Sequence, residues 1–141
     1  QQIYQQLKVM HKEGLIDYQW EPQLGKPDKK VYIMTAFGHE QLVEWLHQIS
    51  KPQKINDSFL VKLYGGHLLD KVVLLDELYQ HVKQHKKALT IMLAIEREYQ
   101  QLSQQERNDL AFPFLTLRRG IIGEQAWLAW AQEVEVFLQE K

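Results

Sequence analysis

Glutamine and lysine side chains are the groups in the N-terminal third that could recognise a partner chemically. They occur in an amphipathic run at the start of the chain and around a turn that contains Gly and Pro. Glutamine can form two hydrogen bonds with adenine in the major groove of DNA, and lysine can bind guanine or a phosphate. The residues of interest are Gln1, Gln2, Tyr4, Gln5 and Lys8 in the run, and Lys26, Lys29 and Lys30 at the turn.

The same pattern has a simpler explanation. Polar residues on a helix commonly face water, and lysines near a turn discourage edge-to-edge strand pairing. The residue types alone therefore leave nucleic-acid contact and plain solvation both open.

A pair of histidines is the other arrangement that could do chemistry. His81 and His85 lie four residues apart in a helical stretch, as two metal ligands on one helix face would, and Glu77 could join them. The chain has no cysteine, and no further ligand falls at metal-site spacing, so a solvated or interfacial histidine pair is favoured. We expect no cofactor and no metal. The sequence contains no Gly-rich phosphate loop, GxSxG or HExxH motif, which gives no support to an enzyme.

The periodicity of the sequence predicts the elements that would position the N-terminal run and the lysines at the turn. Residues 1–13 have helical spacing, and residues 15–20 and 29–34 alternate like two strands on either side of a turn. Thr35 is a candidate cap for a helix that continues to about residue 46. Helix, hairpin and helix in this order predict the back half of a winged helix-turn-helix, with Leu7, Tyr32 and Trp45 in the supporting core.

The amino-acid sequence of this stretch resembles that of the PadR family of transcriptional regulators. The segments that carry the resemblance are QIYQQL from Gln2, EGLI from Glu13, GKPDKKVY from Gly25 and TAFG from Thr35. Within the family, the wing EPQLGKPDKKVY (Glu21–Tyr32) looks most similar to the AphA-type virulence regulators. The match covers roughly residues 1–46 and has fixed internal spacing.

The resemblance implies a DNA-binding regulator, and it also points to a missing part. The family places two further helices before this point, so we expect the biological polypeptide to be longer than this chain. Some members bind small aromatic effectors, which makes such an effector, or a second regulator, a candidate partner. Trp127, Trp130, Tyr79 and Tyr99 are the aromatic residues that could line an apolar cavity for it, although aromatics at helical spacing are more often core.

Composition sets wider limits. Among 141 residues, 17 Lys and Arg against 18 Asp and Glu give a net charge of −1, so the chain has no bulk basic excess for nucleic acid. With 45% hydrophobic and 25% charged residues it is typical of a globular protein. The absence of cysteine fits a reducing interior. No apolar run is long enough to span a membrane, so we expect a cytoplasmic protein without a membrane partner.

The C-terminal two thirds predict long helices. A polar, Pro-containing linker begins at Ser50, which divides the chain into a winged-helix domain (1–50) and a helical, coiled-coil-like dimerisation domain (51–141). From Asp70 to about Leu102 neither Pro nor Gly interrupts the pattern, and near-heptad apolar steps continue. A last helix follows Pro113. Leu117–Arg119 and Gln125–Ala131 also resemble the last helix of the AphA-type regulators.

These helices carry more apolar surface than they can bury on each other, which predicts a homodimer. The alternative is an intrachain hairpin that packs on the N-terminal domain. The residues expected at the dimer interface are Leu75, Leu78, Val82, Leu89, Met92, Tyr99, Trp127, Trp130, Val134 and Phe137.

The sequence thus predicts a mainly α (α+β) protein and a bacterial, sequence-specific DNA-binding transcriptional regulator. It would act on double-stranded DNA as a homodimer through a major-groove helix and a basic wing. The alternative is a dimeric helical scaffold whose winged helix binds protein, which near-neutral charge in residues 1–46 supports, since five Lys face six acidic residues there.

Overall fold

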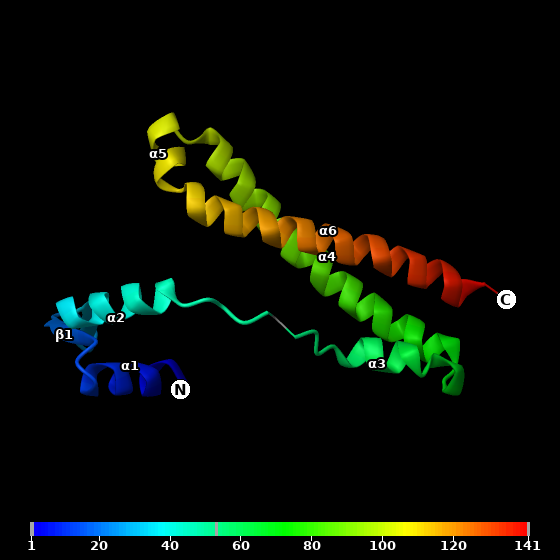
Figure 1. The fold of residues 1–141 in the computed structure, drawn as a ribbon, viewed down its shortest axis with the longest axis horizontal. Helices are drawn as coiled ribbons and strands as arrows, with labels where there is room; N and C mark the ends of the chain where they lie inside the picture. The colour runs from blue at the N-terminus through cyan, green and yellow to red at the C-terminus, as the bar shows by residue number, and fades with distance from the viewer. Residues whose placement is uncertain (1, 53, 141) are drawn as a thin grey trace. The chain divides into compact units, whose positions relative to one another are not determined.

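Two separate units make up the chain in the computed structural model, which describes residues 2–52 and 54–140 (Figure 1). The first unit spans residues 1–54 and the second spans residues 55–141. Each is described by itself.

The first unit begins with helix α1 (Gln2–Lys12). Gly14 ends it with a φ of 74°, a left-handed conformation that glycine adopts without a Cβ clash. The backbone N–H of Leu15 donates to the carbonyl of Met10 at 2.9 Å, which closes the last turn. The chain therefore leaves the helix directly into a strand.

The wing is an antiparallel ribbon of β1 (Ile16–Glu21) and β2 (Lys29–Met34). Its register pairs Ile16 with Met34 at the base and Glu21 with Lys29 near the turn. Gly25 lies in the connecting turn with a φ of 71°. Because side chains alternate along a strand, one face of the ribbon carries the even-numbered residues of both strands.

Helix α2 (Ala36–His47) closes the first unit. The Thr35 hydroxyl accepts a hydrogen bond from the backbone N–H of Gly38 at 2.9 Å, as an N-cap does, and donates to the carbonyl of Gly14 at 2.6 Å. Thr35 therefore fastens the start of α2 to the end of α1. The predicted cap is confirmed.

Trp45 differs from its expected place in the core. Its side chain is 64% exposed, and it lines an open apolar cavity of about 350 Å³ together with Met10 and Leu42. The described part of the unit packs only one side of α2 against the turn at Leu15, so the tryptophan lies at the rim. Leu7 and Tyr32 are half-buried.

The second unit is entirely helical. Its elements are α3 (Ser58–Tyr64), the short 3₁₀ turn η1 (Gly66–Leu68), α4 (Lys71–Gln101), α5 (Gln104–Asp109) and α6 (Ala111–Gln139). Asp57, Asp70 and Ser103 cap α3, α4 and α5 through their side chains. The sequence predicts a short helix over 59–68 that Gly65 and Gly66 weaken and could bend or end, and in the structure α3 does end before Gly65.

Helices α4 and α6 form an antiparallel pair (Figure 1). At one end Lys71 Nζ donates to the carbonyl of Glu140 at 2.9 Å, and at the other the rings of Tyr99 and Phe114 stack at 4.0 Å. The two helices approach closely at Gly120, where a Cβ would lie 2.9 Å from Met92 Sδ. The two long helices thus form a hairpin within the second unit.

The core of this unit lies where α3 meets both long helices. Its fully buried side chains come from all three helices, with α3 supplying Phe59. The buried cluster consists of Phe59, Leu74, Leu78, Ala131, Val134 and Leu138. Mostly helical structure with one small ribbon confirms the predicted fold class. Within residues 2–52 and 54–140, no helix has both the length and the apolar character needed to cross a membrane.

Candidate nucleic-acid interface

Helix α1 presents its polar residues to solvent. None of its described residues is buried, and Gln2, Tyr4, Gln5 and Lys8 are all exposed. Residues three or four apart share a helix face, so Tyr4, Gln5 and Lys8 lie on adjacent parts of one surface. Gln1 lies outside the described residues. Together with Gln2, this surface offers two amides and one ammonium group, which can donate to base edges or phosphates.

The three wing lysines, by contrast, differ in their surroundings. Lys26 lies in the exposed turn beside Gly25. Lys29 forms an ion pair with Glu21, with Nζ 3.1 Å from Oε2 and both side chains about half exposed. Lys30 carries its ammonium 3.9 Å from the ring centre of Tyr18 and 5.0 Å from that of Trp20. The sequence could not show that the lysines have different contacts, because these contacts depend on strand register.

An aromatic cluster lies on the even-numbered face of the wing. Tyr18 contacts Tyr32 at 5.8 Å and Trp20 at 6.1 Å between ring centres, and the ring of His11 from α1 lies 5.0 Å from Tyr18. The sequence pattern predicts only strands here. Aromatic residues at alternate positions of both strands were the signal that could have found the cluster.

The cluster also ties the wing to α1. His11 Nε2 lies 3.5 Å from the Asp17 carboxylate, in addition to its ring contact with Tyr18. The exposed face of α1 and the wing are therefore held as parts of one unit by contacts at the end of the helix.

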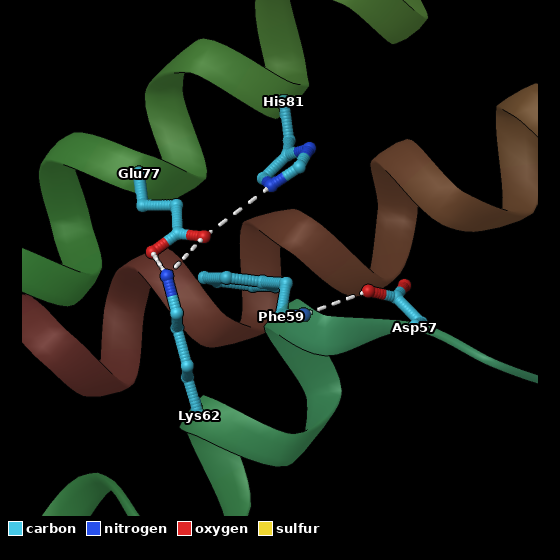
Figure 2. A network of polar contacts seen from close by, with 5 residues as sticks. All are labelled: Asp57, Phe59, Lys62, Glu77 and His81. Atoms are coloured by element: carbon cyan, nitrogen blue, oxygen red, sulfur yellow. Dashed lines mark hydrogen bonds and ion pairs between the residues drawn. The ribbon is translucent and has the colours of Figure 1, made fainter.

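In the second unit, His81 and Glu77 belong to a network of polar and ring contacts with residues of α3 and its cap (Figure 2). Glu77 accepts hydrogen bonds from Lys62 Nζ at 2.9 and 3.0 Å, and its Oε1 lies 3.8 Å from His81 Nε2. The His81 ring lies 5.2 Å from that of Phe59, whose own N–H donates to Asp57 Oδ1. This network joins α3 to α4.

His85 has different partners. Its ring stacks on Trp127 with centres 3.7 Å apart, and its Nδ1 hydrogen-bonds with Glu124 Oε2. Over the described residues, no group of three or more His, Cys, Asp or Glu side chains is arranged to hold a metal ion. His85 therefore both packs and hydrogen-bonds between α4 and α6, whereas His81 contacts other helices through its ring alone.

The residues expected at a dimer interface fall into three groups by their exposure. Leu78 and Val134 are buried in the core of the chain itself, which leaves them nothing to offer a partner. Phe137 is exposed. The half-buried residues are Leu75, Val82, Leu89, Met92, Tyr99, Trp127 and Trp130.

Arg118 pairs differently from the sequence expectation. The acids near it in sequence, such as Glu106, Asp109 and Glu124, are the partners that the sequence predicts. In the structure its Nη1 instead lies 2.7 Å from Glu96 Oε1. Glu96 comes from the facing helix α4, so the pair depends on how the hairpin closes. Sequence proximity favoured the wrong partners.

Two polar groups in this unit have shifted pKa values. Tyr79 donates a hydrogen bond to Glu135 Oε1 at 2.8 Å, and this bond to the neutral phenol raises the pKa of Tyr79. The Ser103 hydroxyl and backbone N–H both donate to Glu106, which lowers the pKa of that carboxyl. The Tyr79 bond joins α4 to α6, and the Glu106 bonds cap α5. Both groups are distant from the wing in sequence.

Comparisons with known proteins agree with the sequence resemblance. The model of the virulence activator alpha C-terminal family matches residues 55–139, and that of the PadR-like transcriptional regulator family matches residues 1–44. A probable transcriptional regulator of Mycobacterium tuberculosis is 29% identical over 151 residues, which cover 100% of this chain and 80% of the relative.

Two solved structures share the fold. The crystal structure of Bacillus subtilis PadR in complex with operator DNA aligns with a TM-score of 0.77 at 23% identity, covering 98% of this chain and 78% of that one. The Vibrio cholerae virulence activator AphA aligns with a TM-score of 0.71 at 29% identity, covering 97% and 76%. Because the model of the virulence activator alpha C-terminal family spans more than half of the chain, the chain belongs to that family, and its residues 1–44 match the PadR-like transcriptional regulators.

Proposed function

We propose that this protein binds operator DNA sequence-specifically as a homodimer, with α1 in the major groove and the wing on the phosphate backbone. The observation that carries the proposal is the exposed polar face of α1 joined to a lysine-bearing ribbon through His11. In winged-helix proteins this combination separates two tasks: helix side chains select bases, while wing cations bind phosphates.

Gln5 and Lys26 test the two tasks separately. Both side chains are exposed, so replacing either with alanine leaves the core intact. We expect Gln5→Ala to change the preference between DNA sequences, because an amide that selects a base is lost. We expect Lys26→Ala to weaken binding to all sequences equally and to reduce the salt dependence, because a phosphate contact is lost.

The experiment is a gel shift on genomic fragments and on random duplexes of equal length, at two salt concentrations. Gln41→Ala on the exposed side of α2 is a matched control for loss of a surface amide. Equal affinity of the parent protein for genomic and random duplexes would contradict sequence-specific binding. Failure to bind either would favour the protein-binding scaffold.

Dimerisation in the proposal rests on apolar side chains that the second unit leaves exposed. On α6 alone, Phe112, Leu115 and Phe137 are 83%, 65% and 61% exposed. Leaving a large apolar side chain in water costs about 1.5–3 kcal/mol relative to burying it. A second copy is the simplest way to cover such residues, and it would place two wings on one duplex.

A small aromatic effector completes the proposed partners. Bacillus subtilis PadR has also been solved in complex with p-coumaric acid, which supports an aromatic ligand for this chain only by analogy. In the second unit, Tyr99 and Phe114 line an apolar cavity of about 330 Å³ that is large enough for one aromatic ring. Titrating p-coumaric acid into the DNA complex is the test, with release of DNA as the expected result and unchanged binding as the contrary one.

A further inference from the structure

The strand register places Lys30 of the wing directly opposite Trp20 and diagonal to Tyr18. Trp20 pairs with Lys30, and Tyr18 pairs with Tyr32, so these four residues share one face of the ribbon. The Lys30 ammonium lies 3.9 Å from the ring centre of Tyr18 and 5.0 Å from that of Trp20. Both distances are within the range of a cation–π contact.

The neighbouring lysine points to the opposite face, where its partner is a carboxylate. Lys29 is opposite Glu21 in the register, and the two charges lie 3.1 Å apart. Two adjacent cations of the wing are therefore held by different chemistry, one by an acid and the other by aromatic rings.

This difference matters for binding a phosphate. A carboxylate cancels the charge of its lysine and repels an approaching phosphate, so the ion pair must open before Lys29 can act. Aromatic rings carry no net charge, so Lys30 keeps its full positive charge while its position is restricted. A cation that is already positioned loses less side-chain freedom on binding.

The Lys30 ammonium covers one face of the Tyr18 ring, while Trp20 is 60% exposed. Tyr18 and Trp20 meet edge to face at 89°. The geometry is suited to holding a cation.

We propose that Trp20, with Tyr18, is a positioning residue that holds Lys30 as the principal phosphate-binding cation of the wing, and that Lys29 contributes less. The inference rests on the proposed function, since it assigns unequal roles within the same DNA-binding site.

The first arm of the test measures affinity for one duplex by fluorescence anisotropy over a series of salt concentrations. Lys30→Met should reduce the slope of log K against log salt by about 0.9, the value for one lost phosphate contact on duplex DNA. Lys29→Met should reduce it by less than half as much. Glu21→Gln should raise affinity and slope, because it frees Lys29. Equal slopes for the two lysine variants would overturn the inference.

The second arm is a double-mutant cycle between Trp20 and Lys30. Trp20→Leu should weaken binding several-fold when Lys30 is present and have little effect in the Lys30→Met background. Trp20→Phe, which keeps an aromatic ring, should restore most of the loss. A purely structural role for Trp20 would weaken binding equally in both backgrounds, and that additive result would also overturn the inference.

Circular dichroism of each variant checks the fold. If Trp20→Leu does not fold, Trp20→Phe and Glu21→Gln together with the lysine slopes still decide the question. If the parent protein binds no duplex at all, the proposed function fails and the inference with it. Binding by the parent with additive effects of Trp20 and Lys30 overturns the inference alone.

Discussion

The backbone of Gly38 in α2 packs directly against the carbonyl of Leu15, at the junction of α1 and the wing. A Cβ on Gly38 would lie 1.9 Å from the Leu15 oxygen and 2.8 Å from its carbonyl carbon. The Leu15 carbonyl also accepts a hydrogen bond from the backbone N–H of Thr35 at 3.1 Å, so it cannot move without breaking a backbone contact. This close approach sets the position of α2 relative to the first residue before β1.

We expect Gly38→Ala to destabilise the first unit by about 3 kcal/mol or more, at the upper end of the cost of overpacking, because backbone atoms cannot rotate away. Urea unfolding followed by tryptophan fluorescence measures the change. Gly65→Ala is the matched control, since its nearest atoms would be 3.8 Å from the added Cβ, and it should change stability by less than about 1 kcal/mol. Similar losses for both variants would contradict the packing argument.

Arg118 and Glu96 should stabilise the α4–α6 pair measurably. Their atoms lie 2.7 Å apart, with Glu96 only 17% and Arg118 39% exposed, so water screens the pair incompletely. We expect Arg118→Met to cost about 1 kcal/mol, the range for a partly exposed charged hydrogen bond. The adjacent, exposed Arg119 provides the control variant Arg119→Met, for which thermal unfolding should change little. A larger loss at Arg119 would show that the pair is not the stabilising contact.

The capping box at α5 should make stability depend on pH. Hydrogen bonds from the hydroxyl and backbone N–H of Ser103 lower the pKa of Glu106 in the folded state. Such a group binds a proton more weakly when folded, so its contribution is present above the ordinary Glu pKa of about 4.3 and is lost as pH falls through the folded value. Glu106→Gln should therefore be less stable than the parent at neutral pH.

The measurement compares urea midpoints of the parent and Glu106→Gln at about pH 7 and in the acid range below the pKa of Glu. The difference should shrink as pH falls. Glu133→Gln, at an exposed position of α6, controls for loss of one negative charge. A difference that stays constant with pH would argue against a role for ionised Glu106.

Phe137 should contribute to the proposed homodimer. It is 61% exposed although it is apolar, and only Val134 and Leu138 beside it are buried within the chain. Phe137→Glu should raise the dimer dissociation constant by tenfold or more, since about 1.5–3 kcal/mol of apolar burial is lost and about 1.4 kcal/mol is tenfold. Sedimentation at micromolar concentration measures this, with Gln132→Glu as the charge-matched control. A parent protein that sediments as a monomer would refute the dimer.

The sequence predicted much of the local structure, for identifiable reasons. A cap such as Thr35 acts on backbone groups within three residues of itself, so its type and spacing are enough to predict it. Gly14 ends α1 for an equally local reason, its left-handed φ. The comparisons with known proteins confirmed the family resemblance. The structure confirmed the mainly helical fold with one ribbon. The roles assigned to Gln5 and Lys26 stay predictions.

The tertiary structure decided which distant groups meet. Arg118 bonds Glu96 across the hairpin, and Glu124 bonds His85, because the closing of α4 on α6 sets partners far apart in the chain. Lys29 and Lys30 look alike in sequence, yet strand register gives one a carboxylate and the other two rings. Residue type and short-range spacing therefore determined the helices, caps and ribbon of this protein. Pairing across helices and strands depends on long-range packing, and only the folded chain settled it.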